Sequence, residues 1–307
     1  MSQHKWKKLD FGSKIEIVAP ASSTKPEVLQ KSIDYLKLKG FRVHVNEGIL
    51  NPYLFHASPD QERFQFLKAA LNSDADAIWA IRGGYGSNRL LPELVKLKKP
   101  KKQKIFIGIS DVTSLHLFLN EKWKWPTLHA SLLDRLAQDK LPIEAVEETF
   151  SVLMGKTKQV SFDGLKPLNV KAEKAKLISG IIVGGNLMTL QSTLGTPYQI
   201  KSPGKILFLE EIDERGYRID RMLTHLKQSQ VLKNLKAIVF GHFIGGIEPD
   251  SKTSKVWEAI HRFAQENPSL PMWTGVESGH DVHIRPLPLG AKAKISKNSL
   301  IISTGVS

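Results

Sequence analysis

Ser110 stands where an apolar run gives way to a helical pattern, in the stretch KIFIGISDVTSLHLFLNEK (104–122). The run before it is typical of a buried strand, and the apolar spacing after it is typical of a helix. A hydroxyl at such a junction can act as a nucleophile at the carboxyl edge of a sheet, with the N–H of Asp111 in an oxyanion hole. Serine is also a preferred helix cap, and Val112 replaces the second glycine of the nucleophile-elbow pattern, so both interpretations stay open.

Three glycines follow another apolar run, in IRGGYGSNRLL (81–91). Gly83, Gly84 and Gly86 allow the backbone to approach a ligand closely, so this loop could complete an oxyanion hole or cradle a phosphate. Their spacing matches neither the P-loop nor the dinucleotide-binding fingerprint. A tight strand-to-helix turn without a ligand is the alternative.

Two acidic residues, Glu210 and Glu211, end the apolar run ILFLEE (206–211). A carboxylate that follows a buried strand is costly unless it has a partner. We therefore expect one of the pair to point into a site and the other into solvent. An ordinary strand end is the alternative interpretation.

Among the ten histidines, those in SGHDVHIRP (278–286) lie in a glycine-flanked loop, where a base can be held near a cleft. His280 and His283 could suggest a metal pair, but no H-E-x-x-H arrangement or thiolate accompanies them, so we expect no metal. Other histidines fall in the amino-terminal tail or in helical patterns: His4, His116, His225 and His261.

The elements that must position these residues alternate along the first half of the chain. Strand patterns occupy 14–20, 41–45, 77–81 and 104–109, and helical patterns occupy 25–40, 60–73, 87–99 and 142–156. This alternation predicts an α/β fold with a doubly wound parallel sheet. Polar residues that follow its strands would meet at the carboxyl edge.

The second half has a different pattern. Short strands and turns replace the regular alternation, and later segments predict strands at 205–212 and 235–241, helices at 217–229 and 254–267, and a closing hairpin at 288–303. We place a boundary between residues 157 and 175. The expected domains are 1–160, a doubly wound domain, and 161–307, a mixed α/β domain.

Composition excludes several classes of protein. The chain of 307 residues has no cysteine, which excludes disulfides and thiolate metal sites. Its net charge of +14 invites a nucleic-acid interpretation, but the lysines are spread out and are not interleaved with aromatic residues. We expect no nucleic-acid partner, no membrane segment and a cytoplasmic location. The charge could steer an acidic small substrate.

Seven stretches in order resemble the LD-carboxypeptidase family, serine peptidases that trim murein tetrapeptides. They are IVAPAS, IRGGYGSNRLL, IGISDVTSLH, LISGIIVGGNLMTLQSTLGTP, LFLEEIDERGYRIDRML, SGHD and PLPLGAKAKI. The resemblance covers nearly the whole chain. One departure is TLHASLLDRL (127–136), which keeps His129 but lacks the glycine and proline of the His-Gly-Pro stretch found in many members.

The resemblance implies a catalytic triad in which Ser110 is the nucleophile, His280 is the base and Glu210 orients the imidazole. It also implies an oxyanion hole formed by the backbone N–H groups of Gly84 and Asp111. The nucleophile domain and the domain that supplies Glu and His would enclose the active site between them. Residues beside the glycine and histidine loops are expected to bind substrate: Arg82, Tyr85 and Arg285.

The implied reaction releases D-Ala from a murein tetrapeptide without metal or organic cofactor, in a homodimer. The rival within the family is an immunity-type amidase that cleaves acyl-adenylate conjugates. A purine stacked on Trp123, Trp125 or Trp273 would favour that rival. A rival of another class is a non-catalytic protein that binds acidic ligands, which gives the three implied catalytic residues no reason to converge.

Overall fold

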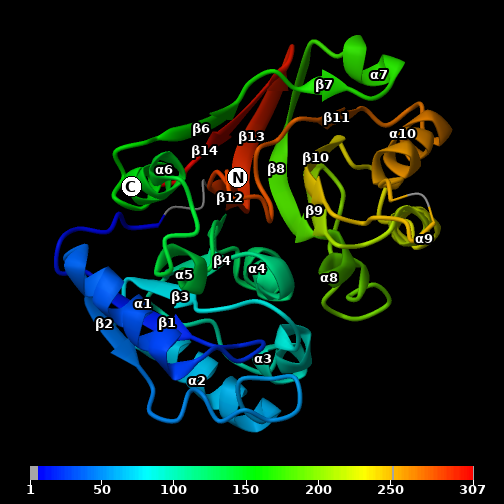
Figure 1. The fold of residues 1–307 in the computed structure, drawn as a ribbon. Helices are drawn as coiled ribbons and strands as arrows, with labels where there is room; N and C mark the ends of the chain where they lie inside the picture. Colours follow the sequence, from blue (N-terminus) through cyan, green and yellow to red (C-terminus); the bar gives the residue numbers. More distant parts are fainter. Residues whose placement is uncertain (1–5, 251, 307) are drawn as a thin grey trace.

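The computed structural model describes residues 6–250 and 252–306, so His4 lies outside the described residues. The first of its two sheets has the order β12-β5-β4-β3-β1-β2, and its strands β1, β2 and β3 lie in the lower part of Figure 1. Its strands are β1 (Lys14–Val18), β2 (Arg42–Val45), β3 (Ala77–Ala80), β4 (Ile105–Gly108), β5 (Thr127–His129) and β12 (Leu287–Leu289). Strands β1 to β5 are parallel, and β12 is antiparallel to β5.

Helices cover both faces of this sheet, because its strands are apolar on both sides. The helices are α1 (Pro26–Leu38), α2 (Asp60–Asn72), α3 (Leu91–Leu94), α4 (Thr113–Phe118), α5 (Leu133–Leu136) and α6 (Ile143–Leu153). Trp79 of β3 packs in the core that contains residues of α1 and α6. Its neighbour Ile78 packs in the core that contains residues of α2 and α4. The doubly wound prediction is confirmed.

The second sheet has the order β6-β14-β13-β8-β9-β10-β11-β7. Its strands are β6 (Gln159–Phe162), β7 (Lys166–Pro167), β8 (Leu177–Asn186), β9 (Lys205–Ile212), β10 (Ala237–Ile244), β11 (Met272–Thr274), β13 (Ala291–Ser296) and β14 (Ser299–Ser303). Strands β8 to β11 are parallel, and the outer strands are antiparallel, so the sheet is mixed. With its helices it forms the mixed α/β arrangement predicted for the second half of the chain. Its helices are α7 (Val170–Glu173), α8 (Leu187–Gln191), α9 (Gly216–Gln228) and α10 (Val256–Glu266).

Three features differ from the sequence-based expectation. The helix expected over 87–99 is a 3₁₀ turn, η1 (Ser87–Leu90), followed by the single turn of α3. The stretch expected to hold only short strands contains the ten-residue β8. The expected closing hairpin is formed by β13 and β14, but β12 just before it joins the first sheet.

The two sheets are therefore connected by a strand from the second half of the chain. Figure 1 shows β12 near the middle of the molecule, where α4 and α8 also lie side by side. The boundary at residue 160 stays a prediction, and β12 crosses it. No helix among the described residues is long and apolar enough to span a bilayer.

Candidate active site

Ser110 occupies a strained turn at the carboxyl end of β4. Its φ is 70°, in the left-handed region that residues other than glycine rarely adopt. It begins the 3₁₀ turn η2 (Ser110–Val112), which leads into α4. No side-chain cap is formed at either helix start, and within 6–250 and 252–306 the Ser110 hydroxyl has no hydrogen-bond partner. The helix-cap interpretation is therefore wrong, and strain of this kind is concentrated at functional sites.

The glycine loop packs directly against Ser110. A Cβ atom placed on Gly83 would lie 2.7 Å from Ser110 Cβ and 3.0 Å from Ser110 Oγ. Gly84 has a φ of 99°, and a Cβ there would overlap the Ser22 hydroxyl. That hydroxyl accepts a hydrogen bond from Tyr85 N at 3.1 Å. Glycine is required at both positions for close approach, which places the loop's backbone beside the serine.

Asp111 fastens the serine turn to the same loop. Its buried carboxylate accepts a hydrogen bond from Ser87 N at 2.7 Å, and its carbonyl accepts one from Ser87 Oγ at 2.5 Å. Burial raises the pKa of Asp111 above its ordinary range. The Asp111 side chain thus ties the two segments whose backbone N–H groups were predicted to form an oxyanion hole. That role stays a prediction.

Glu210 and His280 form a short hydrogen bond in the candidate site. His280 Nδ1 lies 2.6 Å from Glu210 Oε2; the Glu210 side chain is fully buried, and His280 exposes 12% of its side chain. Burial lowers the pKa of His280, but the charge of Glu210, the hydrogen bond to it and the charge of Glu211 outweigh burial and raise it overall. This arrangement leaves Nε2 of the oriented imidazole to accept a proton.

Two hydrogen bonds join the segments that carry these residues. Asn186 is the β-sheet partner of Glu210, and its N–H donates to Thr113 Oγ1, three residues after Ser110, at 3.0 Å. Arg135 of α5 donates to the carbonyl of Asp281, next to His280, at 3.2 Å. The Ser110 turn therefore adjoins the strand end that carries Glu210. Across the described ranges, no hydrogen bond joins Ser110 to His280.

Glu211 does not face solvent, so that prediction is wrong. Only 4% of the residue is exposed. Its carboxylate accepts hydrogen bonds from Asn186 Nδ2 at 2.7 Å, Met188 N at 2.8 Å and Ile212 N at 3.0 Å. The start of α8 supplies the first two donors and covers this side of β9.

The other histidines have separate environments. His116 is buried, with Nε2 2.9 Å from the carbonyl of Gly108, and burial lowers its pKa to about 4. Burial also lowers the pKa of His129 well below its ordinary range. His225 pairs with Gln191 at 2.5 Å. The described part of the chain contains no group of three or more side chains that could hold a metal ion, so His280 and His283 belong to no such group.

The predicted substrate-binding residues have protein partners. Arg82 is half exposed and pairs with Asp134 at 3.2 Å. Arg285 forms a bidentate pair with Glu148 at 2.7 and 2.8 Å and a longer one with Glu277, which disfavours a substrate role. Tyr85 is 47% exposed and stacks on the ring of His56. All three roles stay predictions.

Arg63 is a supporting residue that the sequence analysis missed. Its side chain is fully buried and donates to the carbonyls of Pro20, Ser58 and Gly86, so it links β1 to the glycine loop. It also pairs with Asp60. The available signal was an arginine on the face of the predicted helix 60–73 that also carries Leu67 and Leu71.

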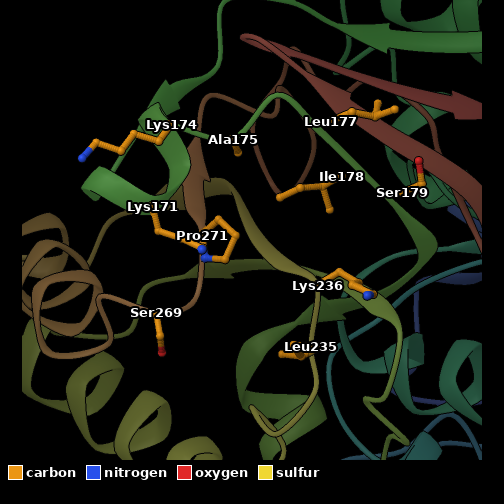
Figure 2. Close-up of a pocket in the computed structure, with 10 residues that line it drawn as sticks. All are labelled: Lys171, Lys174, Ala175, Leu177, Ile178, Ser179, Leu235, Lys236, Ser269 and Pro271. Carbon is orange, nitrogen blue, oxygen red and sulfur yellow. The ribbon is translucent and has the colours of Figure 1, made fainter.

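Two cavities differ in their position relative to the candidate site. A cavity of about 420 Å³ lies at the amino ends of β8, β10 and β11 and is lined by lysines such as Lys171 and Lys236 (Figure 2). In α/β sheets ligands bind at the carboxyl ends of the strands, so this cavity is not the candidate site. A cavity of about 370 Å³ adjoins the glycine loop, and Lys25, Arg82 and Lys140 line it.

Both halves of the chain match one peptidase family. Residues 15–130 match the LD-carboxypeptidase N-terminal domain, and residues 179–295 match the LD-carboxypeptidase C-terminal domain. A putative carboxypeptidase of Rickettsia conorii is 40% identical over 287 residues, which are 92% of this chain and 88% of that protein. A probable murein peptide carboxypeptidase of Bacillus subtilis is 31% identical over 99% of this chain and 96% of its own.

Solved structures share the whole architecture. Muramoyltetrapeptide carboxypeptidase from Oxalobacter formigenes superposes with a TM-score of 0.80 at 28% identity, over 95% of this chain and 99% of that one. The microcin C7 self-immunity protein superposes with a TM-score of 0.81 over 98% of both chains, and at 20% identity this likeness concerns the fold alone. With two domain matches and relatives along nearly its full length, the chain belongs to the LD-carboxypeptidase family.

Proposed function

We propose that this chain is a serine LD-carboxypeptidase that hydrolyses the bond before the terminal D-Ala of murein tetrapeptides in peptidoglycan recycling. The observation that carries the proposal is the 2.6 Å hydrogen bond between His280 and the buried Glu210. It lies at a strand end that adjoins the strained turn of Ser110. The family supports a peptidase, and the serine mechanism, cytoplasmic location and homodimer belong to the proposal.

In the proposed mechanism, Nε2 of His280 takes the proton of Ser110 while the serine oxygen attacks the scissile carbonyl carbon. Glu210 holds the tautomer and stabilises the imidazolium. Backbone N–H groups of Gly84 and Asp111 donate to the developing oxyanion. The imidazolium then protonates the departing D-Ala nitrogen, and water hydrolyses the acyl-enzyme and frees the serine.

An acidic substrate suits the cavity beside the glycine loop. Its lining includes Lys25, Arg82 and Lys140 together with the hydroxyl-bearing Ser23 and Thr24. Murein peptides carry several carboxylates, and cationic cavities favour anionic ligands. This charge supports a murein peptide without identifying the preferred one.

The decisive experiment compares three peptides at equal concentration: the tetrapeptide with terminal D-Ala, its L-Ala epimer and the D-Ala amide. We expect D-Ala release from the first and little cleavage of the other two, because a held carboxylate forces the wrong epimer's methyl into the wall of the site. Equal cleavage of the D- and L-terminated peptides would contradict the proposed specificity for a terminal D-Ala.

The alternative is an immunity-type amidase that cleaves acyl-adenylate conjugates, the rival that the family resemblance raised. The three tryptophans considered for purine stacking are buried: Trp123, Trp125 and Trp273 expose 5%, 0% and 0%. They therefore give this alternative no support. Faster cleavage of an aminoacyl-adenylate analogue than of the tetrapeptide would nevertheless establish it.

A further inference from the structure

Glu211 lies back to back with the candidate catalytic acid. Successive residues of a strand face opposite sides of the sheet, so Glu210 contacts His280 while Glu211 contacts the start of α8. Its Oε1 accepts from Asn186 Nδ2 and from Ile212 N, and its Oε2 accepts from Met188 N. Three donors converging on one buried carboxylate fix its position.

The same network reaches the serine turn. Asn186 donates its backbone N–H to Thr113 Oγ1 at 3.0 Å, and its side-chain oxygen caps α8 by accepting from Thr189 N at 3.0 Å. Thr113 is fully buried and directly follows the turn that Ser110 begins. An unbroken path therefore runs from Glu211 through Asn186 to the element that carries the nucleophile.

We propose that Glu211 is a positioning residue that, through Asn186 and Thr113, holds the Ser110 turn in register with the Glu210–His280 pair. This inference rests on the proposed function of those catalytic residues. Glu211 reaches no reacting atom in this role. Through Asn186 and Thr113 it joins β9, the strand of the second sheet that carries Glu210, to the Ser110 turn that follows β4 of the first sheet.

Electrostatics adds a property that simple packing would lack. Burial and the neighbouring Glu210 raise the pKa of Glu211 to about 7. We therefore expect the network to weaken as the pH falls through neutrality, because a protonated carboxyl loses acceptor capacity. The charge of Glu211 also raises the pKa of His280. The charged and titratable groups that influence the pKa of His280 come from β9, α5, β5 and β10. They are Glu210, Glu211, Arg135, His129 and, through its interaction with Glu210, His242.

The first test is Glu211→Gln, which keeps the shape but turns one acceptor into a donor. We expect kcat to fall about tenfold or more while KM stays within about twofold. We also expect the ascending limb of the pH profile to move to lower pH, because one charge that raises the pKa of His280 is lost. NMR titration of the His280 ring, assigned with His280→Gln, measures the same shift without substrate.

A matched pair tests the path through Thr113. Thr113→Val removes the acceptor at similar volume and should lower kcat about tenfold, whereas Thr113→Ser keeps the hydroxyl and should stay within about threefold of wild type. Glu121→Gln is the carboxylate control, because the Glu121 side chain is only 7% exposed but pairs with Lys205 at the other end of β9. It should leave the pH profile unmoved.

Two results would overturn the proposal. One is a Glu211→Gln protein whose turnover falls equally at every pH with an unmoved His280 titration. The other is equal turnover in Thr113→Val and Thr113→Ser. If wild type cleaves no murein peptide, the proposed function fails instead, and the His280 titration together with fluorophosphonate labelling of Ser110 still decides the role of Glu211.

Discussion

At the scale of single residues, Ser110, Glu210 and His280 are expected to act as a unit. Ser110→Ala or His280→Ala should each lower kcat by about 10³-fold or more, and the double variant should be little worse, because triad members are strongly non-additive. Release of D-Ala measures turnover, and Ser229→Ala at the end of α9 is a control. Wild-type turnover in Ser110→Ala would show that the nucleophile lies elsewhere.

The backbone strain at Ser110 predicts a separation of activity from stability. A residue other than glycine at a φ of 70° costs roughly 1–2 kcal/mol. Ser110→Gly should relieve this strain, so we expect it to be about 1 kcal/mol more stable than Ser110→Ala, although both are inactive. Urea denaturation with equal m-values measures the difference. A less stable glycine variant would show that the turn is not strained.

Sequence motifs identified Glu210 and His280, whose hydrogen bond the structure contains. They could not show that Glu211 is buried, because its environment depends on α8. The start of this five-residue helix supplies two of the three hydrogen-bond donors to the Glu211 carboxylate. The φ of Ser110 was equally inaccessible, since strand and helix patterns say nothing about the dihedral angles of the residue that joins them.

At the scale of elements, Arg63 and Arg89 offer a matched comparison, because both pair with Asp60. The Arg63 side chain is fully buried and holds three carbonyls around the glycine loop, whereas Arg89 is half exposed. We expect Arg63→Met to cost about 3 kcal/mol or more and Arg89→Met less than about 1 kcal/mol. Chemical denaturation measures both, and equal losses would contradict a supporting role for Arg63.

Elements with strong periodicity were predicted closely, as α1 and α2 show: 25–40 became Pro26–Leu38, and 60–73 became Asp60–Asn72. The helix expected over 87–99 was too long: α3 ends at Leu94, with Val95 as its C-cap. Strand β12 was missed because three residues carry no periodic signal, and its partner β5 is far away in the sequence.

At the scale of the whole molecule, the lysines that contribute to the net charge of +14 are expected to affect substrate capture differently according to where they lie. Lys140 lines the cavity beside the glycine loop, and Lys236 lines the distant cavity of Figure 2. We expect Lys140→Met to lower kcat/KM for the tetrapeptide by up to about fivefold at low salt, with a smaller effect at high salt, where screening shortens the field. Lys236→Met should leave kcat/KM unchanged at both low and high salt. An equal loss in both variants would indicate attraction by net charge alone.

The connection made by β12 predicts that the two sheets unfold together. Leu289 is fully buried in a core that also contains Ile107 of β4 and Phe208 of β9, so it contributes to both sheets. Leu289→Ala should cost about 2–5 kcal/mol and lower a single shared unfolding midpoint. Hydrogen exchange of β4 and β9 in increasing denaturant reports the unfolding of each sheet separately.

A second variant, Leu226→Ala, lies on α9 in a different core. It should also lower the unfolding midpoints of both sheets if they form one cooperative unit. Two separate midpoints, with only the second sheet affected by Leu226→Ala, would show instead that the sheets belong to independently unfolding domains.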